Sequence, residues 1–238
     1  MSRVRQKRVL VTRDAAGNAR LRSRLTEHGC EVVEVPLVAL EGIDVELPVP
    51  APGELVVLTS RRAAQEALER WGAEILAEVE LAVVGGATAR VLSPLVPAHR
   101  PTQATAAALV ELLAPRVAGR RVHFPSAQVV TGGLVEGLTQ AGAEVIRTAV
   151  YANRLPEGAA EALAAALPVD VAPLASSSAA RRLGALAPGF DAPVVAMGPS
   201  TARAAASVGL RVAAVADPPG LEGLVAATLE VLRSTSPA

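Results

Sequence analysis

The chain has 238 residues, of which 51% are hydrophobic, 19% charged and 2% aromatic, and its 23 basic side chains balance 23 acidic ones. That length and apolar content suit two ordinary domains with packed cores and exclude a disordered chain. The scarcity of aromatic rings and the balanced charge exclude a nucleic-acid-binding module, which needs stacking platforms or a positive field.

Short apolar runs alternate with helical patterns along the chain. We expect buried strands at residues 9–12, 55–59, 81–84, 122–125, 144–147, 169–175, 194–197 and 211–215. Between them, apolar residues share one helix face in the sets Ala64, Ala67, Leu68 and Trp71; Leu134, Leu138 and Ala141; and Leu221, Leu224, Val225 and Leu232. The alternation predicts an α/β fold of doubly wound, flavodoxin-like parallel sheets, whose strands are covered on both faces.

Three places depart from this alternation. Residues 36–41 and 149–154 each follow a strand without a helix, and we interpret both as extended connectors. Pro173 lies inside an expected strand and has no N–H to donate, which predicts an edge position or a bulge.

The chain is roughly doubled. "VLVTRDAAGNARLRSRLTEHGCEVVEV" at 9–35 matches "VHFPSAQVVTGGLVEGLTQAGAEVIRT" at 122–148. "VVLTSRRAAQEAL" at 56–68 matches "APLASSSAARRLG" at 172–184, and "AVVGGATAR" at 82–90 matches "VAMGPSTAR" at 195–203. Three matched pairs in the same order at nearly constant spacing indicate one fold unit present twice.

The apolar runs, the first residues and the cysteine count indicate where in the cell the protein is located. No apolar run approaches the roughly 20 residues that span a bilayer, and the start "MSRVRQKRV" lacks the apolar stretch of a secretory signal. The single cysteine, Cys30, excludes an internal disulfide and is either a buried inert thiol or a reactive one. We therefore expect a cytoplasmic protein that contacts no membrane.

Four strand-to-helix junctions are rich in small polar residues: Thr59–Ser60, Gly85–Thr88, Ser176–Ser178 and Gly198–Thr201. Ligands of open α/β sheets bind at the carboxyl ends of the strands, where the N–H groups of the next helix favour anions. Any single junction is also explained by ordinary helix capping. All four together favour an anion-binding cleft, although no GxGxxG or phosphate-loop motif is present.

Arginines lie at or soon after these junctions: Arg13, Arg61, Arg62, Arg90, Arg154, Arg181, Arg182 and Arg203. Each alone can be a solvated helix residue, but the set favours a polyanionic small molecule, because the guanidinium fork suits carboxylates and phosphates.

The sequence shows no pattern typical of a metal site or of a nucleophilic catalytic triad. The three histidines are scattered without the spacing of metal ligands, so we expect no metal. No Ser/His/Asp order, nucleophile elbow or pair of carboxylates on one helix face is present. The only tyrosine, Tyr151, lies in a connector, where a packing role and a functional role both remain open.

The segments "VLVTR", "VVLTSRRAAQEAL", "LAVVGGATAR", "GAEVIRTAVY", "SSSAARRL" and "VVAMGPSTARAAASVGLRV", taken in order, resemble the uroporphyrinogen-III synthase family from about Val9 to Leu232. The resemblance implies that the two lobes exchange their first strand–helix–strand unit. One domain then consists of residues 1–36 with 155–238 and the other of residues 37–154, and the two connectors pair as the link between them.

The resemblance also implies a reaction. The family closes linear hydroxymethylbilane into uroporphyrinogen III with inversion of the last pyrrole ring and loss of water. The substrate's eight carboxylates suit a cleft of helix starts and arginines, and because the pyrroles supply the electrons no cofactor is required. We expect a monomer whose partner is this linear tetrapyrrole.

Carried over position by position, the resemblance makes Tyr151 the candidate proton donor. The matching substrate-binding positions are Thr12, Arg13, Ser60, Arg61, Gly86, Thr88, Ser176, Ser177, Ser178, Gly198, Ser200 and Thr201. The chain departs from the family pattern at Asp14, where a proline is usual, at Arg61 and Arg62, where residues are smaller, and at Ser126, where an arginine is common. A non-catalytic two-lobed relative that binds an anionic ligand or regulates remains an alternative, and a sugar-phosphate enzyme is a further one.

Overall fold

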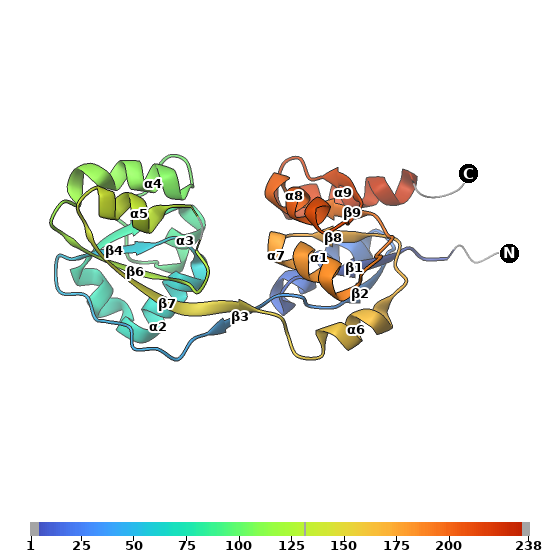
Figure 1. The fold of residues 1–238 in the computed structure, drawn as a ribbon, viewed down its shortest axis with the longest axis horizontal. Helices are drawn as coiled ribbons and strands as arrows, with labels where there is room; N and C mark the ends of the chain where they lie inside the picture. Colours follow the sequence, from blue (N-terminus) through green and yellow to red (C-terminus); the bar gives the residue numbers. More distant parts are fainter. Residues whose placement is uncertain (1–4, 131, 235–238) are drawn as a thin grey trace. The chain divides into compact units, whose positions relative to one another are not determined.

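A computed structural model describes residues 5–130 and 132–234 (Figure 1). The fold is a mixed α/β structure in which parallel strand pairs dominate. The chain divides into two compact units. Unit 1 contains the residues up to Ala39 and those from Arg154 onward, and unit 2 is Leu40–Asn153.

Unit 1 alternates strands with helices. Its elements are β1 (Arg8–Val11), α1 (Ala15–Glu27), β2 (Glu31–Glu34), α6 (Ala159–Ala166), β8 (Ala172–Leu174), α7 (Ser177–Leu186), β9 (Val194–Ala196), α8 (Pro199–Ser207), β10 (Val212–Val215) and α9 (Leu221–Ser234). Strands β1 and β2 pair in parallel, as do β8, β9 and β10. The two sets are joined where Leu10 N donates to Val171 O at 3.0 Å.

Pro173 occupies the edge strand of the three-stranded sheet β10-β9-β8, which confirms the edge position expected from the sequence. It lies in β8, in regular register with Val195 of β9, and β1 is bridged on the other side at Val171. Alternate residues of a strand turn their N–H groups to the same neighbour, so Pro173 and Val171 both face β1. Because Pro173 has no N–H to offer there, the pairing between β1 and β8 stops after one bridge.

Unit 2 holds the second sheet. Its elements are β3 (Ala39–Gly42), which begins at the unit boundary, β4 (Leu55–Leu58), α2 (Arg61–Glu78), β5 (Glu80–Val83), α3 (Gly86–Val91), α4 (Ala106–Leu113), the short 3₁₀ helix η1 (Ala114–Arg116), β6 (Arg121–Ala127), α5 (Leu134–Gln140) and β7 (Glu144–Arg154). The strand order is β3-β7-β6-β4-β5. On the outer side of β5, His99 bridges to Ala82.

All eight strands expected from the apolar runs are present, with ends shifted by a few residues. The strand expected before residue 36 is β2, and the two connectors expected to pair are β3 and the end of β7, which are neighbours in the sheet. The sequence pattern divided β7, in which residues 144–147 and the connector 149–154 form one continuous strand. The apolar helix faces at Trp71, Leu138 and Leu224 are buried as expected.

Both faces of the strands are covered by helices. In β4, Val56 and Leu58 pack with α2 and α3, whereas Leu55 and Val57 pack with α4 and α5. In unit 1 the two faces pack against α1 and α9 and against α6, α7 and α8. Continuous apolar runs are therefore required in the fully buried strands β4, β8 and β9, because neither of their faces meets water.

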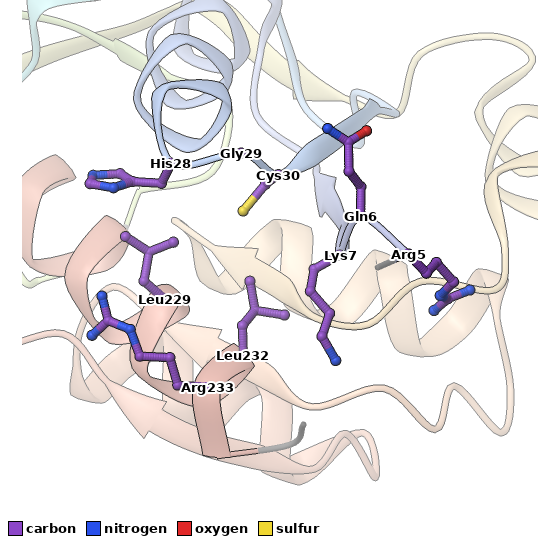
Figure 2. A pocket seen from close by; sticks show the side chains of 9 residues that line it. All are labelled: Arg5, Gln6, Lys7, His28, Gly29, Cys30, Leu229, Leu232 and Arg233. Carbon is purple, nitrogen blue, oxygen red and sulfur yellow. The ribbon is translucent and has the colours of Figure 1, made fainter. Parts of the chain in front are cut away.

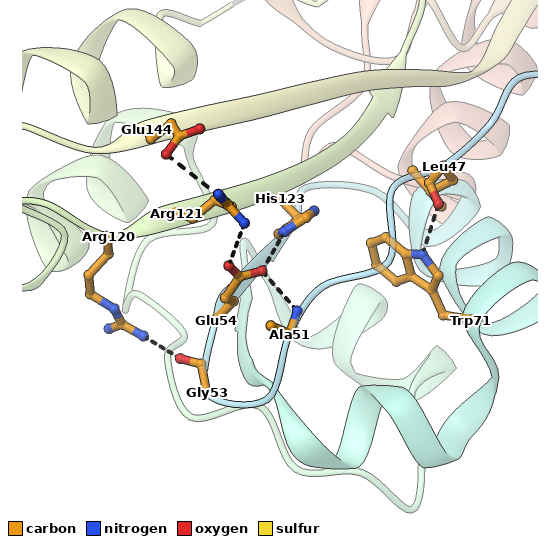
Figure 3. A network of polar contacts seen from close by, with 9 residues as sticks. All are labelled: Leu47, Ala51, Gly53, Glu54, Trp71, Arg120, Arg121, His123 and Glu144. Carbon is orange, nitrogen blue, oxygen red and sulfur yellow. Dashed lines mark hydrogen bonds and ion pairs between the residues drawn. The ribbon is translucent and has the colours of Figure 1, made fainter.

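A polar network closes the amino ends of three strands of unit 2 (Figure 3). The carboxylate of Glu54, just before β4, accepts from Ala51 N at 2.9 Å, from His123 Nε2 at 2.7 Å and from Arg121 at 3.2 Å. The His123 ring meets Trp71 edge to face, with centroids 6.2 Å apart. The network thus fixes the chain before β4 to the start of β6.

A second carboxylate lies in the same region. Glu80, which begins β5, pairs with Arg120 at 2.5 Å and with His99. Burial raises the pKa of Glu54, but the hydrogen bonds from Ala51 and His123 and the nearby charges outweigh it, so the net pKa is lowered. The pKa of Glu80 is lowered by its hydrogen bonds from Arg120 and then His99.

Acid is therefore expected to destabilise unit 2. A carboxylate whose folded pKa is depressed contributes stability above its unfolded pKa, about 4.3, and loses it as the pH falls through the lower folded pKa. Glu54→Gln should lower the unfolding free energy by about 1 kcal/mol at pH 7 and flatten the decline between about pH 5 and pH 3. Urea unfolding across that range measures both effects. Glu74→Gln, at an exposed position on α2, is the matched control. An equal acid response in Glu54→Gln and the parent protein would contradict the assignment.

Candidate active site

The polar residues singled out in unit 2 gather at the carboxyl ends of its strands. We call this set the unit 2 rim: Ser60, Arg61, Gly86, Thr88 and Tyr151. Strand β4 leads directly into Ser60, β5 leads into Gly86, and Tyr151 stands opposite Ala127 near the ends of β7 and β6. Parallel pairing places all of these ends at one edge of the sheet.

The closest functional contact in the unit 2 rim joins Ser60 and Tyr151. Ser60 Oγ and Tyr151 Oη lie 3.0 Å apart, although the residues are 91 positions apart in the chain. Ser60 is also the N-cap of α2, because its Oγ accepts from Ala63 N at 3.0 Å. Tyr151 is 8% exposed, so its ring is packed and its hydroxyl is held by the start of a helix.

Gly86 and Thr88 belong to the first turn of α3. Its N-cap, Gly85, has extended backbone angles and supplies no side-chain cap. Thr88 is buried at 3% exposure. The backbone N–H groups at this helix start therefore have no capping side chain from Gly85.

The matching residues of unit 1 also meet at the carboxyl ends of its strands. We call this set the unit 1 rim: Thr12, Arg13, Ser176, Ser177, Ser178, Gly198, Ser200 and Thr201. Ser176 caps α7, accepting from Ala179 N at 3.2 Å, and its Oγ lies 3.1 Å from that of Ser178. Gly198 begins α8 without a side-chain cap and is followed by Pro199 in the first turn. This helix start is thus open to an external acceptor.

Thr12 behaves differently from the rest of the unit 1 rim. Its side chain is fully buried, and its Oγ1 has no hydrogen-bond partner among the described residues. The following turn is fixed from within, since Arg13 N donates to Asn18 Oδ1 at 2.8 Å and Gly17 N to the N-cap Asp14 at 2.6 Å. The Thr12 hydroxyl reaches no ligand in this arrangement. Asp14, which replaces the usual proline, is the cap of α1.

The arginines divide into structural and exposed groups. Arg62 pairs with the buried Glu66 at 2.5 Å, and Arg182 donates to Leu37 O at 2.6 Å and to Arg154 O at 2.9 Å. Burial lowers the pKa of Arg182. Among the described residues, no ion pair involves the exposed Arg61, Arg90 and Arg203. Arg181, also exposed, and the half-buried Arg13 are in no ion pair among the described residues either, so these five arginines are available to an anionic ligand.

Sequence patterns gave no reason to select Arg147. From β7 its Nε donates to Ser126 Oγ at 3.0 Å, and it donates to the carbonyls of Ala127 at 2.9 Å and Gln128 at 2.7 Å. Ser126 is the position where the family commonly has an arginine, so here a neighbouring strand brings a cation to the end of β6. The contact between Arg147 and Ser126 depends on how β6 and β7 are paired, so no sequence motif predicts it.

A hollow of about 340 Å³ in unit 1 lies at the opposite ends of the strands (Figure 2). It is lined by Arg5, Gln6, Lys7, His28, Gly29, Cys30, Leu229, Leu232 and Arg233. Cys30 is buried there, and its burial raises its pKa, which favours the inert thiol. His28 caps the C-terminus of α1 and Arg233 lies in the last turn of α9, positions where cations offset the helix dipole. The hollow is separate from the unit 1 rim.

Metal-binding clusters and membrane-spanning helices are both absent from the described part of the chain. Within residues 5–130 and 132–234, no three His, Cys, Asp or Glu side chains gather in a group fit to hold a metal ion. No helix in these ranges has the length and apolar character needed to cross a membrane.

The chain is an α/β protein with hydroxyl-rich helix starts at the carboxyl ends of its parallel strands, which is where proteins of this class bind their ligands. Residues 4–226 match the family described as uroporphyrinogen-III synthase HemD. The chain is also 31% identical over 245 residues to the chloroplastic uroporphyrinogen-III synthase of Oryza sativa subsp. japonica, covering 95% of this chain and 81% of that relative. The chain belongs to the uroporphyrinogen-III synthase family, as the sequence resemblance predicted.

Solved structures share the fold. Uroporphyrinogen-III synthetase from Helicobacter pylori 26695 is similar with a TM-score of 0.70 and 18% identity, covering 98% of this chain and 100% of that one. A mutant uroporphyrinogen III synthase from the extremely thermophilic bacterium Thermus thermophilus gives 0.64 and 18%, covering 96% and 99%. At this identity the likeness concerns the fold alone.

The unpaired hydroxyl of Thr12 generates a stability prediction. Thr12→Val should leave the unfolding free energy unchanged or raise it by up to about 1 kcal/mol, because it removes a buried polar group that has no partner. Thr228→Val is the matched control in the same unit, since the buried Thr228 Oγ1 donates to Leu224 O at 2.6 Å. The control should lose about 1 kcal/mol in urea unfolding. Equal losses in both variants would show that the Thr12 hydroxyl has a bonding partner.

Proposed function

We propose that the chain catalyses the uroporphyrinogen-III synthase reaction, closing hydroxymethylbilane with inversion of the last pyrrole ring and loss of one water. Membership of the family carries this conclusion. The two rims support it, because a substrate with eight carboxylates needs many N–H, hydroxyl and guanidinium donors. The helix starts of α2, α3, α7 and α8 offer such donors at the strand ends.

Each rim offers donors that suit the carboxylates of the substrate. Uncapped backbone N–H groups at Gly86 and Gly198, together with the hydroxyls of Ser177 and Ser200, take carboxylates by hydrogen bonding. The exposed Arg61 adds positive charge beside Ser60. Holding several carboxylates at once brings the ends of a flexible chain together, which lowers the entropic part of the barrier.

The chemistry begins with departure of the terminal hydroxyl. The C–O bond of the hydroxymethyl group breaks, its electron pair leaves with oxygen, and pyrrole electrons form an azafulvene. The substituted carbon of the last ring attacks this electrophile to give a spiro intermediate, which fragments and closes again at the other carbon of that ring. A proton lost from that carbon restores the aromatic ring, so the balance is loss of one water.

Tyr151 is the proposed proton donor to the departing hydroxyl. It is the single tyrosine of the chain, it lies in the unit 2 rim, and its Oη is 3.0 Å from Ser60 Oγ. Proton donation from a positioned phenol assists a poor leaving group without requiring a strong acid. The proton released when the last ring regains aromaticity can return to the phenolate.

The proposed architecture is two flavodoxin-like domains that exchange their first strand–helix–strand units: residues 1–36 with 155–238, and residues 37–154. In unit 1, β2 pairs with β1, the order β10-β9-β8 forms a three-stranded sheet, and an isolated bridge from Val9 to Val171 brings β1 beside the β8 end of that sheet. In unit 2 the order β7-β6-β4-β5 continues to the bridge at His99. Both follow the doubly wound order in which the second strand lies outside the first. A monomer located in the cytoplasm stays a prediction.

The product isomer tests the proposed function. With the purified protein, hydroxymethylbilane should give uroporphyrinogen III, separated from the type I isomer by chromatography after oxidation. Spontaneous closure without ring inversion gives type I, which serves as the background in a protein-free reaction. Type I alone, at the background rate, would favour the non-catalytic ligand-binding alternative.

Replacement of the tyrosine tests its role. Tyr151→Phe should lower kcat by about 100-fold, because it removes a general acid and keeps the ring. KM should change little, since the carboxylates are held by other groups. Initial rates over a range of substrate concentrations measure both constants. An unchanged kcat would remove Tyr151 from the mechanism and leave the family assignment intact.

A further inference from the structure

The hydrogen bond between Ser60 and Tyr151 has a direction that matters for the reaction. Ser60 Oγ lies 3.0 Å from Tyr151 Oη, and either oxygen can donate. If Tyr151 donates to Ser60, its proton is engaged and points away from any substrate. If Ser60 donates, the phenolic proton is left for a second acceptor.

The cap of α2 favours donation by Ser60. A serine hydroxyl has one proton and two lone pairs, and one lone pair of Ser60 already accepts from Ala63 N at 3.0 Å. A hydroxyl that accepts a hydrogen bond is polarised and becomes a better donor. The proton of Ser60 is therefore best directed at the phenolic oxygen.

The electrostatic field at the N-terminus of α2 also favours donation by Ser60 to the phenolic oxygen. The first turn of α2 contains no acidic residue and begins with Arg61 and Arg62. The positive end of the helix and the charge of Arg61 favour negative charge on the oxygen atoms beside them, whereas the charge of Arg62 is paired with Glu66. A phenolate formed at Tyr151 is stabilised in that field, and a donor hydroxyl from Ser60 stabilises it further.

We propose that Ser60 is a positioning residue for Tyr151: it donates its hydroxyl proton to the phenolic oxygen, directs the phenolic proton toward the substrate, and stabilises the phenolate left after proton transfer. This inference rests on the proposed function. In the step concerned, the substrate C–O bond breaks, the leaving oxygen takes the phenolic proton to become water, and the phenolate keeps the hydrogen bond from Ser60. The proton released at ring closure restores the phenol.

The single tyrosine makes the contact directly observable. Only Tyr151 contributes a phenolate band to the ultraviolet absorbance, so an alkaline titration of the substrate-free protein measures its pKa alone. Ser60→Gly keeps a tolerated N-cap residue and removes the donor. It should raise the measured pKa of Tyr151 by about one unit, the effect of losing one hydrogen bond to a charged group.

Two further substitutions separate donation from capping. Ser60→Thr keeps both the cap and the hydroxyl and should restore the parent pKa and activity. Ser60→Asp keeps the cap, but its carboxylate only accepts, so it should raise the pKa of Tyr151 more than Ser60→Gly does. Thr105→Gly is the control, because Thr105 caps α4 of the same unit by accepting from Ala108 N at 3.2 Å and lies outside the unit 2 rim.

Kinetics complete the test. Ser60→Gly should lower kcat about tenfold, part of the contribution of a general acid, with KM within about twofold, and Ser60→Thr should recover the rate. A raised KM with an unchanged pKa of Tyr151 would overturn the proposal, because Ser60 would then be a direct substrate contact. A shifted pKa with unchanged kcat would also overturn it while leaving the proposed function standing. An inactive parent protein would overturn the proposed function and the catalytic part of this inference, whereas the titration, which needs no substrate, still decides whether Ser60 donates.

Discussion

The inner strands of both units bury two faces, and this constraint determines where polar side chains can be located. In β4, neighbouring residues belong to opposite apolar clusters, so a hydroxyl or an amine on either face would lose its water without gaining a partner. In the fully buried strands β4, β8 and β9, polar side chains are consequently confined to the residues beyond the strand ends. The carboxyl ends hold the rims, and the amino ends hold the Glu54 network. Helix starts then give the carboxyl ends the donors that suit carboxylates.

Much of this organisation was predictable from local patterns. The apolar runs identified the strands because a doubly covered strand must be apolar throughout, and the spacing of Trp71 and Leu138 identified buried helix faces. Small polar residues after those runs located the helix starts, where Ser60 and Ser176 are caps. These features depend on neighbours along the chain.

Features that depend on register were not predictable. Local pattern cannot show that Ser60, the N-cap of α2, meets Tyr151 of β7, because the two lie 91 residues apart in the chain. Local pattern gave Pro173 an edge position, but it could not show that the missing N–H faces β1, a strand from the other end of the sequence. The burial of Thr12 follows from tertiary packing, which the residue type alone does not predict.

The distribution of rings has a consequence for optical measurements. Both the single tryptophan and the single tyrosine lie in unit 2, and Trp71 packs there against His123. Intrinsic tryptophan and tyrosine fluorescence therefore reports the unfolding of unit 2 and changes little when unit 1 unfolds. Far-ultraviolet circular dichroism reports the loss of helices in both units. Divergence between the two signals would reveal stepwise unfolding with no added label.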